Sequence, residues 1–132
     1  MSEMTYTALT AEECPWKAEA DRVFEIDSGK HTGKVIKVTL TRQEQDINGD
    51  GVPDQLNVKV IAALVDKATG EPVTIAGHAI ETPGKVDSVR MAAISEGEID
   101  VLSWMADLVD AAIFRVLRKE AAMSSYALIP TA

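Results

Sequence analysis

The sequence has little cysteine, few basic residues and no long apolar run. Cys14 is the one cysteine among 132 residues, so an intramolecular disulfide framework is excluded. No apolar stretch approaches the roughly 18 residues that a membrane-spanning helix needs. The 13 lysine and arginine residues are outnumbered by 21 aspartate and glutamate residues, which gives a net charge of −8. We therefore expect neither a nucleic-acid partner nor a membrane partner, because both bind basic surfaces.

The motifs of common enzyme classes are also missing. The chain contains no G-x-S-x-G nucleophile elbow, no Walker loop and no G-x-G-x-x-G fingerprint. His31 and His78 lack the i, i+4 spacing of a zinc-binding helix, and the segment around Cys14 matches no activated-thiol signature. We therefore expect a protein that is not an enzyme. The N-terminus has no basic start and no apolar segment, so we also expect synthesis in the cytoplasm without a signal peptide.

The sequence does contain a series of strand signals followed by one helical stretch. Alternating apolar and polar residues, bounded by turn residues, predict strands over residues 22–26, 34–42, 55–65 and 73–80. Residues 86–91 are a further short strand or the start of a helix. We expect a single α+β domain over residues 1–132, in which a mostly antiparallel meander of three to five strands packs against a C-terminal helix. Its parts are an N-terminal arm (1–21), a β-rich part (22–91), the helix (96–122) and a C-terminal tail (123–132).

From residue 96 the hydrophobic period changes from 2 to about 3.6, which predicts a long amphipathic helix. Ser95 and Glu98 have the spacing of a capping box at its start. One apolar stripe is expected to pack on the sheet, and it consists of Val101, Leu102, Met105, Leu108, Val109, Ala112, Ile113, Val116 and Leu117. The apolar arc widens through Trp104, Ala111 and Phe114, so a second side of the helix is a candidate contact with a neighbouring chain.

Residues 46–54, D-I-N-G-D-G-V-P-D, carry oxygen-bearing side chains at the spacing of a calcium loop. Calcium takes six to eight hard oxygen ligands, at about 2.3–2.6 Å, from a loop that curls around it. Asp46, Asn48 and Asp50 supply side-chain oxygens from positions 1, 3 and 5, and glycine at position 6 permits the sharp turn. The backbone carbonyl of Val52 and the carboxylate of Asp54 complete the set. We therefore expect one bound calcium ion.

This loop resembles the D-x-D-x-D-G calcium loops of dockerins, thrombospondin type 3 repeats and integrin-like FG-GAP blades, and it is most similar to the last group. The resemblance implies calcium binding by Asp46, Asn48, Asp50, the Val52 carbonyl and Asp54. It covers nine of 132 residues, and the chain has the loop once, whereas those families repeat it. An EF-hand is not expected, because position 12 is asparagine rather than glutamate and no helix flanks the loop.

A loop without a bidentate glutamate is expected to bind calcium with a dissociation constant in the micromolar-to-millimolar range. Such a site is occupied at extracellular calcium concentrations and empty in resting cytoplasm. A protein made in the cytoplasm and later released into calcium fits a phage virion component, such as a head-decoration, connector or tail protein. We therefore expect a homo-oligomeric structural or assembly subunit that contacts its own copies or other structural subunits. The alternative is a calcium-dependent module that binds a protein or a glycan. The loop itself has a second interpretation as a polar turn without an ion, since Asn-Gly and Asp-Gly favour turns.

Overall fold

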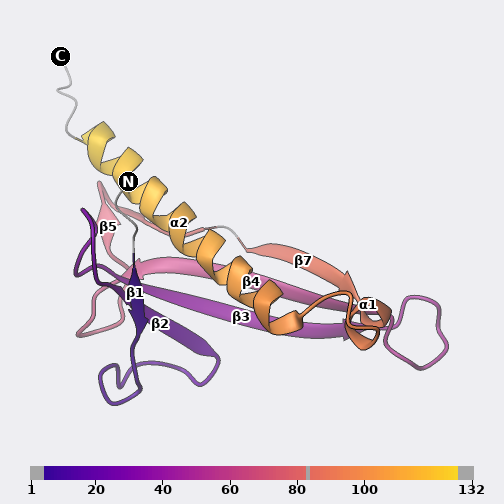
Figure 1. The fold of residues 1–132 in the computed structure, drawn as a ribbon. Helices are drawn as coiled ribbons and strands as arrows, with labels where there is room; N and C mark the ends of the chain where they lie inside the picture. Colours follow the sequence, from indigo (N-terminus) through magenta and orange to yellow (C-terminus); the bar gives the residue numbers. More distant parts are fainter. Residues whose placement is uncertain (1–4, 83, 128–132) are drawn as a thin grey trace.

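The structure is a computed structural model that describes residues 5–82 and 84–127. It holds a five-stranded antiparallel sheet with one long helix lying across a face of it (Figure 1). In sheet order the strands are β1 (Tyr6–Ala8), β2 (Asp21–Ile26), β3 (Val35–Gln45), β4 (Gln55–Val65) and β7 (Lys85–Arg90). The predicted α+β class, with an antiparallel sheet and a C-terminal helix, is confirmed.

β3 and β4 form the centre of the sheet, and each is 11 residues long. They pair in register from Val35 opposite Val65 to Gln45 opposite Gln55. The strands predicted at 22–26, 34–42 and 55–65 therefore exist, and β3 extends three residues past its predicted end. Its last residues are polar, and backbone hydrogen bonding to β4 holds them in the sheet without an apolar pattern. Residues 86–91 form strand β7 up to Arg90, and α1 (Met91–Ser95) follows directly.

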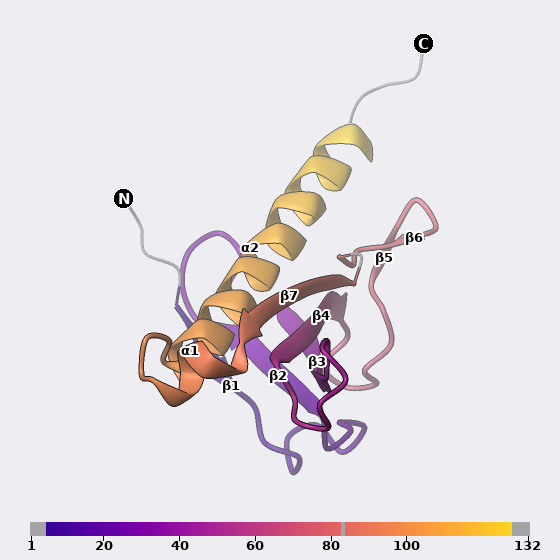
Figure 2. The same ribbon diagram turned by 90° about the vertical axis from the view of Figure 1, so that its right-hand side faces the viewer.

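The single strand predicted over residues 73–80 is wrong. The chain reverses at Ala76 and Gly77, which both have positive φ, 52° and 83°. β5 (Thr74–Ile75) and β6 (His78–Ala79) consequently form a separate small hairpin, which projects beside the main sheet in Figure 2. A two-residue turn with both φ values positive suits the twist of a tight hairpin. Alanine rarely adopts positive φ, so the residue pattern did not predict this turn.

α2 (Val101–Ala127) is 27 residues long, or about 40 Å at 1.5 Å per residue. The prediction of a helix at 96–122 and a tail from 123 is wrong at both ends. The helix begins five residues later and continues to Ala127, so part of the predicted tail is helical. Residues 128–132 of that tail lie outside the described residues, as does Pro83.

The predicted capping box at Ser95 and Glu98 is also wrong. Ser95 ends α1, and Gly97 follows with φ at 77°, which interrupts the helical path. Asp100 caps α2 instead, because one of its carboxylate oxygens accepts the backbone N–H of Leu102 at 3.1 Å. An aspartate in this position satisfies a backbone donor that has no partner within the helix.

The main core lies between α2 and the sheet. Its fully buried side chains come from both layers and include Ile26, Ile36, Val38, Val58, Ile80, Ile113 and Val116. Most of the predicted stripe on α2 therefore faces the sheet. Leu102 is the exception, since it lies in the first turn of α2 and is 76% exposed. Periodicity assigns a residue to a face of a helix, but it does not show how far the opposing layer extends.

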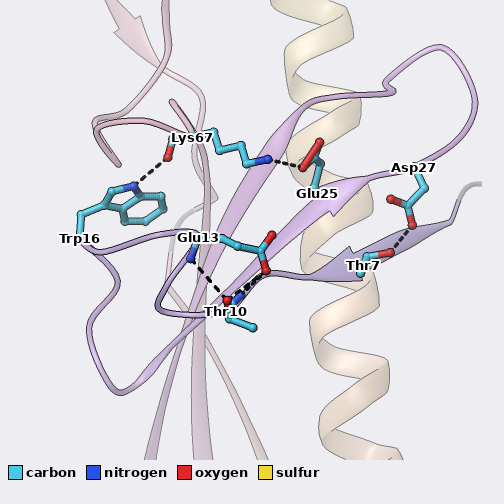
Figure 3. A network of polar contacts seen from close by, with 7 residues as sticks. All are labelled: Thr7, Thr10, Glu13, Trp16, Glu25, Asp27 and Lys67. Atoms are coloured by element: carbon cyan, nitrogen blue, oxygen red, sulfur yellow. Dashed lines mark hydrogen bonds and ion pairs between the residues drawn. The ribbon is translucent and has the colours of Figure 1, made fainter.

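The N-terminal arm covers part of the other face of the sheet. It contributes β1, and it closes one turn with a capping box: the Thr10 N–H donates to Glu13 Oε1 at 3.2 Å, and the Glu13 N–H donates to Thr10 Oγ1 at 3.4 Å (Figure 3). Trp16 donates its indole N–H to the Lys67 carbonyl at 2.9 Å. Under this arm lies a second small core of Leu9, Cys14, Val23, Val35, Ala63 and Val65.

Gly70 is required where the arm meets the loop after β4. Its φ is +74°, and a Cβ at this position would overlap the indole ring of Trp16. We expect Gly70→Ala to lower the free energy of unfolding by about 1–3 kcal/mol, the usual cost of overpacking. Denaturant unfolding followed by tryptophan fluorescence measures this change. Gly29→Ala is the matched control, because Gly29 has a similar φ of +85° and open space around its Cβ position. Equal losses in both variants would contradict the proposed contact with Trp16.

Candidate metal centre

The loop of residues 46–54 joins β3 to β4 and projects past α1 at the end of the hairpin (Figure 1). Asp54 ties the loop to the rest of the fold. Its backbone N–H donates to the Gln45 carbonyl at 2.9 Å, and its own carbonyl accepts the N–H of Met91 at 2.8 Å. The last residue of β3, Gln45, and the first residue of α1, Met91, therefore both hold the loop at Asp54.

Three carboxylates of the predicted ligand set converge in this loop. Asp46, Asp50 and Asp54 each place one oxygen within 4.8 Å of the other two. Asp46 and Asp50 are exposed and Asp54 is half-buried. Among the described residues, no other group of three histidine, cysteine, aspartate or glutamate side chains gathers closely enough to share an ion.

Backbone N–H groups orient the two outer aspartates. Asp46 accepts the N–H of Gly49 at 2.9 Å on one oxygen and that of Gly51 at 2.7 Å on the other. Asp54 accepts the N–H groups of Ile47 at 2.9 Å and of Asn48 at 3.2 Å, both on Oδ2. Each carboxylate oxygen has two lone pairs, so Asp54 has its other oxygen, Oδ1, to offer a cation.

In the middle of the loop, side-chain oxygens also accept backbone N–H groups from residues that follow them. The Asn48 amide oxygen accepts the Asp50 N–H at 3.1 Å, and an Asp50 carboxylate oxygen accepts the Val52 N–H at 2.9 Å. Gly49 and Gly51 have φ values of 79° and 84°, a conformation that L side chains rarely adopt. The alternation of acceptor side chains and glycines therefore curls the chain and fixes the side chains of positions 1, 3 and 5.

The Asp46 carboxyl has a lowered pKa, relative to the ordinary value of 3.8, chiefly because the Gly51 N–H donates to it. The folded chain therefore favours the charged form more than the unfolded chain does. The resulting stability is present above the unfolded pKa and is lost as the pH falls below 3.8 through the folded pKa. Thermal melts in EDTA from neutral to acidic pH should show a smaller loss of Tm for Asp46→Asn than for wild type. Equal losses of Tm in wild type and in Asp46→Asn would contradict a lowered pKa of Asp46 in the folded chain.

The other residues considered for chemistry are spread over the fold. Cys14 is buried under the N-terminal arm, and burial raises the pKa of its thiol. His31 lies in the loop between β2 and β3, where burial and then the neighbouring Lys34 lower its pKa. Its Nδ1 is 3.1 Å from Lys34 Nζ and 3.6 Å from a carboxylate oxygen of Glu120. His78 belongs to the small hairpin of β5 and β6.

Comparisons of the chain with protein-family models, with curated proteins and with solved structures found no match. Within residues 5–82 and 84–127, no helix combines the length and apolar character that crossing a membrane requires. The loop at 46–54 is therefore the feature from which a function can be argued.

Proposed function

We propose that the chain is a non-enzymatic structural or assembly subunit whose β3–β4 loop is fixed by one calcium ion. The observation that carries this proposal is the convergence of the Asp46, Asp50 and Asp54 carboxylates. The Asn48 amide oxygen and the Val52 carbonyl are the proposed neutral ligands. Hard oxygen donors on a curled loop are the set that calcium prefers, and three carboxylates more than neutralise the charge of a divalent ion.

Two apolar side chains on the same loop support a role in assembly. Ile47 is 60% exposed and Val52 is 61% exposed. A loop held by an ion presents such side chains in one arrangement, so a partner that covers them does not bear the cost of ordering the loop. We infer that calcium prepares this loop for contact with another subunit.

Exposed apolar side chains on other elements are not part of this proposed contact. Val86 on the edge strand β7 is 56% exposed, and Leu102 on α2 is also exposed. The most concrete form of the proposal is a subunit of a phage virion, in which modest calcium affinity suffices because extracellular calcium is abundant. A calcium-dependent module that binds a protein or a glycan is the second candidate, and the same converging carboxylates favour it.

Light scattering after size exclusion tests the assembly role. In millimolar calcium we expect wild type to elute as an oligomer, and in EDTA as a smaller species. The double variant Ile47→Ser/Val52→Ser should remain small in calcium, because the apolar contact is gone while the ligands remain. Val86→Ser is the control for removing an exposed apolar residue away from the loop. A wild-type monomer under both conditions would contradict the assembly role and, if calcium still binds, would favour the binding-module candidate.

A further inference from the structure

A hollow lies between the β2–β3 loop and the second half of α2, with a volume of about 460 Å³. It lies at the start of β3, whereas the candidate metal centre follows the end of β3, so the two features occupy different parts of the fold. Its main lining residues are Lys30, His31, Phe114, Leu117, Arg118 and Ala121. Small-molecule sites in proteins have volumes of about 300–1,000 Å³.

The α2 side of the hollow is mainly apolar. Phe114 lines the hollow together with Leu117 and Ala121, and 49% of it is exposed. An exposed phenylalanine ring in a concave site offers a flat apolar surface for another ring or an aliphatic chain. Scattered apolar residues on a convex surface need no such explanation.

The charged residues that line the hollow are basic, although the chain as a whole carries −8. Lys30 and Arg118 are exposed, and neither forms an ion pair with another described residue. The Glu120 carboxylate, 3.6 Å from His31 Nδ1, is already engaged by Lys34 Nζ at 2.7 Å. Among the described residues, no carboxylate lines the hollow to neutralise its two cations.

We propose that this hollow binds a small organic anion, in which a carboxylate, sulfonate or phosphate group is attached to an aromatic or aliphatic body. The Arg118 guanidinium and the Lys30 ammonium are the groups that meet the acid, since both form strong charge-assisted hydrogen bonds with such oxygens. Phe114 and its apolar neighbours receive the body of the ligand. Two cations beside an apolar surface favour a small amphipathic anion over an acidic peptide. The charged side chains of such a peptide would leave the apolar surface uncovered.

The probe for this site is 8-anilinonaphthalene-1-sulfonate, a permanently charged aromatic anion whose fluorescence rises in apolar surroundings. The neutral amine N-phenyl-1-naphthylamine has the same rings without the sulfonate. We expect the folded chain to bind the sulfonate at least about tenfold more tightly than the amine, because the neutral probe cannot form the charge-assisted hydrogen bonds that the sulfonate accepts. Titrations of the full chain with each probe measure this ratio.

Variants assign the binding to the hollow. Arg118→Gln should weaken the sulfonate at least about fivefold and leave the amine unchanged, since only the charged contact is lost. Phe114→Ala should weaken both probes. Arg22→Gln is the matched control, because Arg22 is an exposed arginine on β2 outside the hollow and its replacement changes the net charge equally. Circular dichroism of each variant verifies that it is folded.

Three results would overturn the proposal. The first is equal affinity for the charged and neutral probes. The second is a loss with Arg22→Gln that matches the loss with Arg118→Gln, since that result would reflect net charge alone. The third is displacement of the sulfonate by a short polyglutamate peptide at a similar concentration, which would assign the hollow to an acidic protein segment. None of these outcomes depends on calcium, so all titrations are made in EDTA and are separate from tests of the loop.

Discussion

Asp50→Asn is expected to abolish the rise in Tm that calcium gives to the wild-type protein. An ion present at 10 to 100 times its dissociation constant stabilises the folded state by about 1.4–2.7 kcal/mol. For a chain of 132 residues this corresponds to a Tm increase of about 5–10 °C. Asparagine keeps an oxygen that accepts the Val52 N–H, so the loop conformation is retained while a charged ligand is lost. Thermal melts in calcium and in EDTA measure the effect.

The matched control for this change is Asp66→Asn. Asp66 also accepts loop N–H groups, from Ala68 at 2.8 Å and from Thr69 at 3.3 Å, but it does not belong to the converging aspartates. We expect this variant to keep the full calcium response. If Asp50→Asn instead lowers the Tm equally in calcium and in EDTA, the loop is a turn that uses its aspartates only for backbone hydrogen bonds.

Ile113→Ala should give the largest loss of stability of any single change considered for this fold. Ile113 is fully buried in the core between α2 and the sheet. Removing a large aliphatic side chain from such a site costs about 2–5 kcal/mol, because burial is lost and a cavity remains. Denaturant unfolding should show a lower midpoint with an unchanged slope, which indicates a loss of stability rather than a change in the unfolded state.

Leu102→Ala tests whether an exposed residue of the same apolar stripe contributes to stability. Leu102 belongs to the predicted apolar stripe but is 76% exposed. Its truncation should change the free energy of unfolding by no more than about 0.5 kcal/mol, as for ordinary surface positions. A loss as large as that of Ile113→Ala would mean that the first turn of α2 is covered, either by this fold or by a neighbouring subunit.

The sequence predicted the central strands because most of each strand has one buried face and therefore a clear alternation of apolar and polar residues. It did not predict the reversal at Ala76 and Gly77, since alanine in a positive-φ turn carries no warning in the pattern. The start of α2 was misplaced for a related reason. Ser95 and Glu98 have the spacing of a capping box, but Gly97 between them has positive φ and interrupts the helix, so that Asp100 caps α2 instead.

The convergence of the three aspartates in the candidate metal centre was accessible to prediction because these residues are close together in the sequence. Spacing alone brings Asp46, Asp50 and Asp54 onto one side of a curled loop, which the structure reproduces. The bond from the Met91 N–H to the Asp54 carbonyl was not predictable, because it joins segments that meet only after β7 pairs with β4. The hollow around Phe114 was missed likewise, since its loop and its helix are far apart in the sequence.

Isothermal titration of calcium into the full chain measures whether the loop of residues 46–54 holds an ion. We expect one ion per chain, with a dissociation constant between micromolar and millimolar, for wild type and for Asp66→Asn. Asp50→Asn should show no saturable heat over the same range. Absence of binding by wild type at millimolar calcium, or unchanged binding by Asp50→Asn, would contradict the proposal that this loop holds the ion.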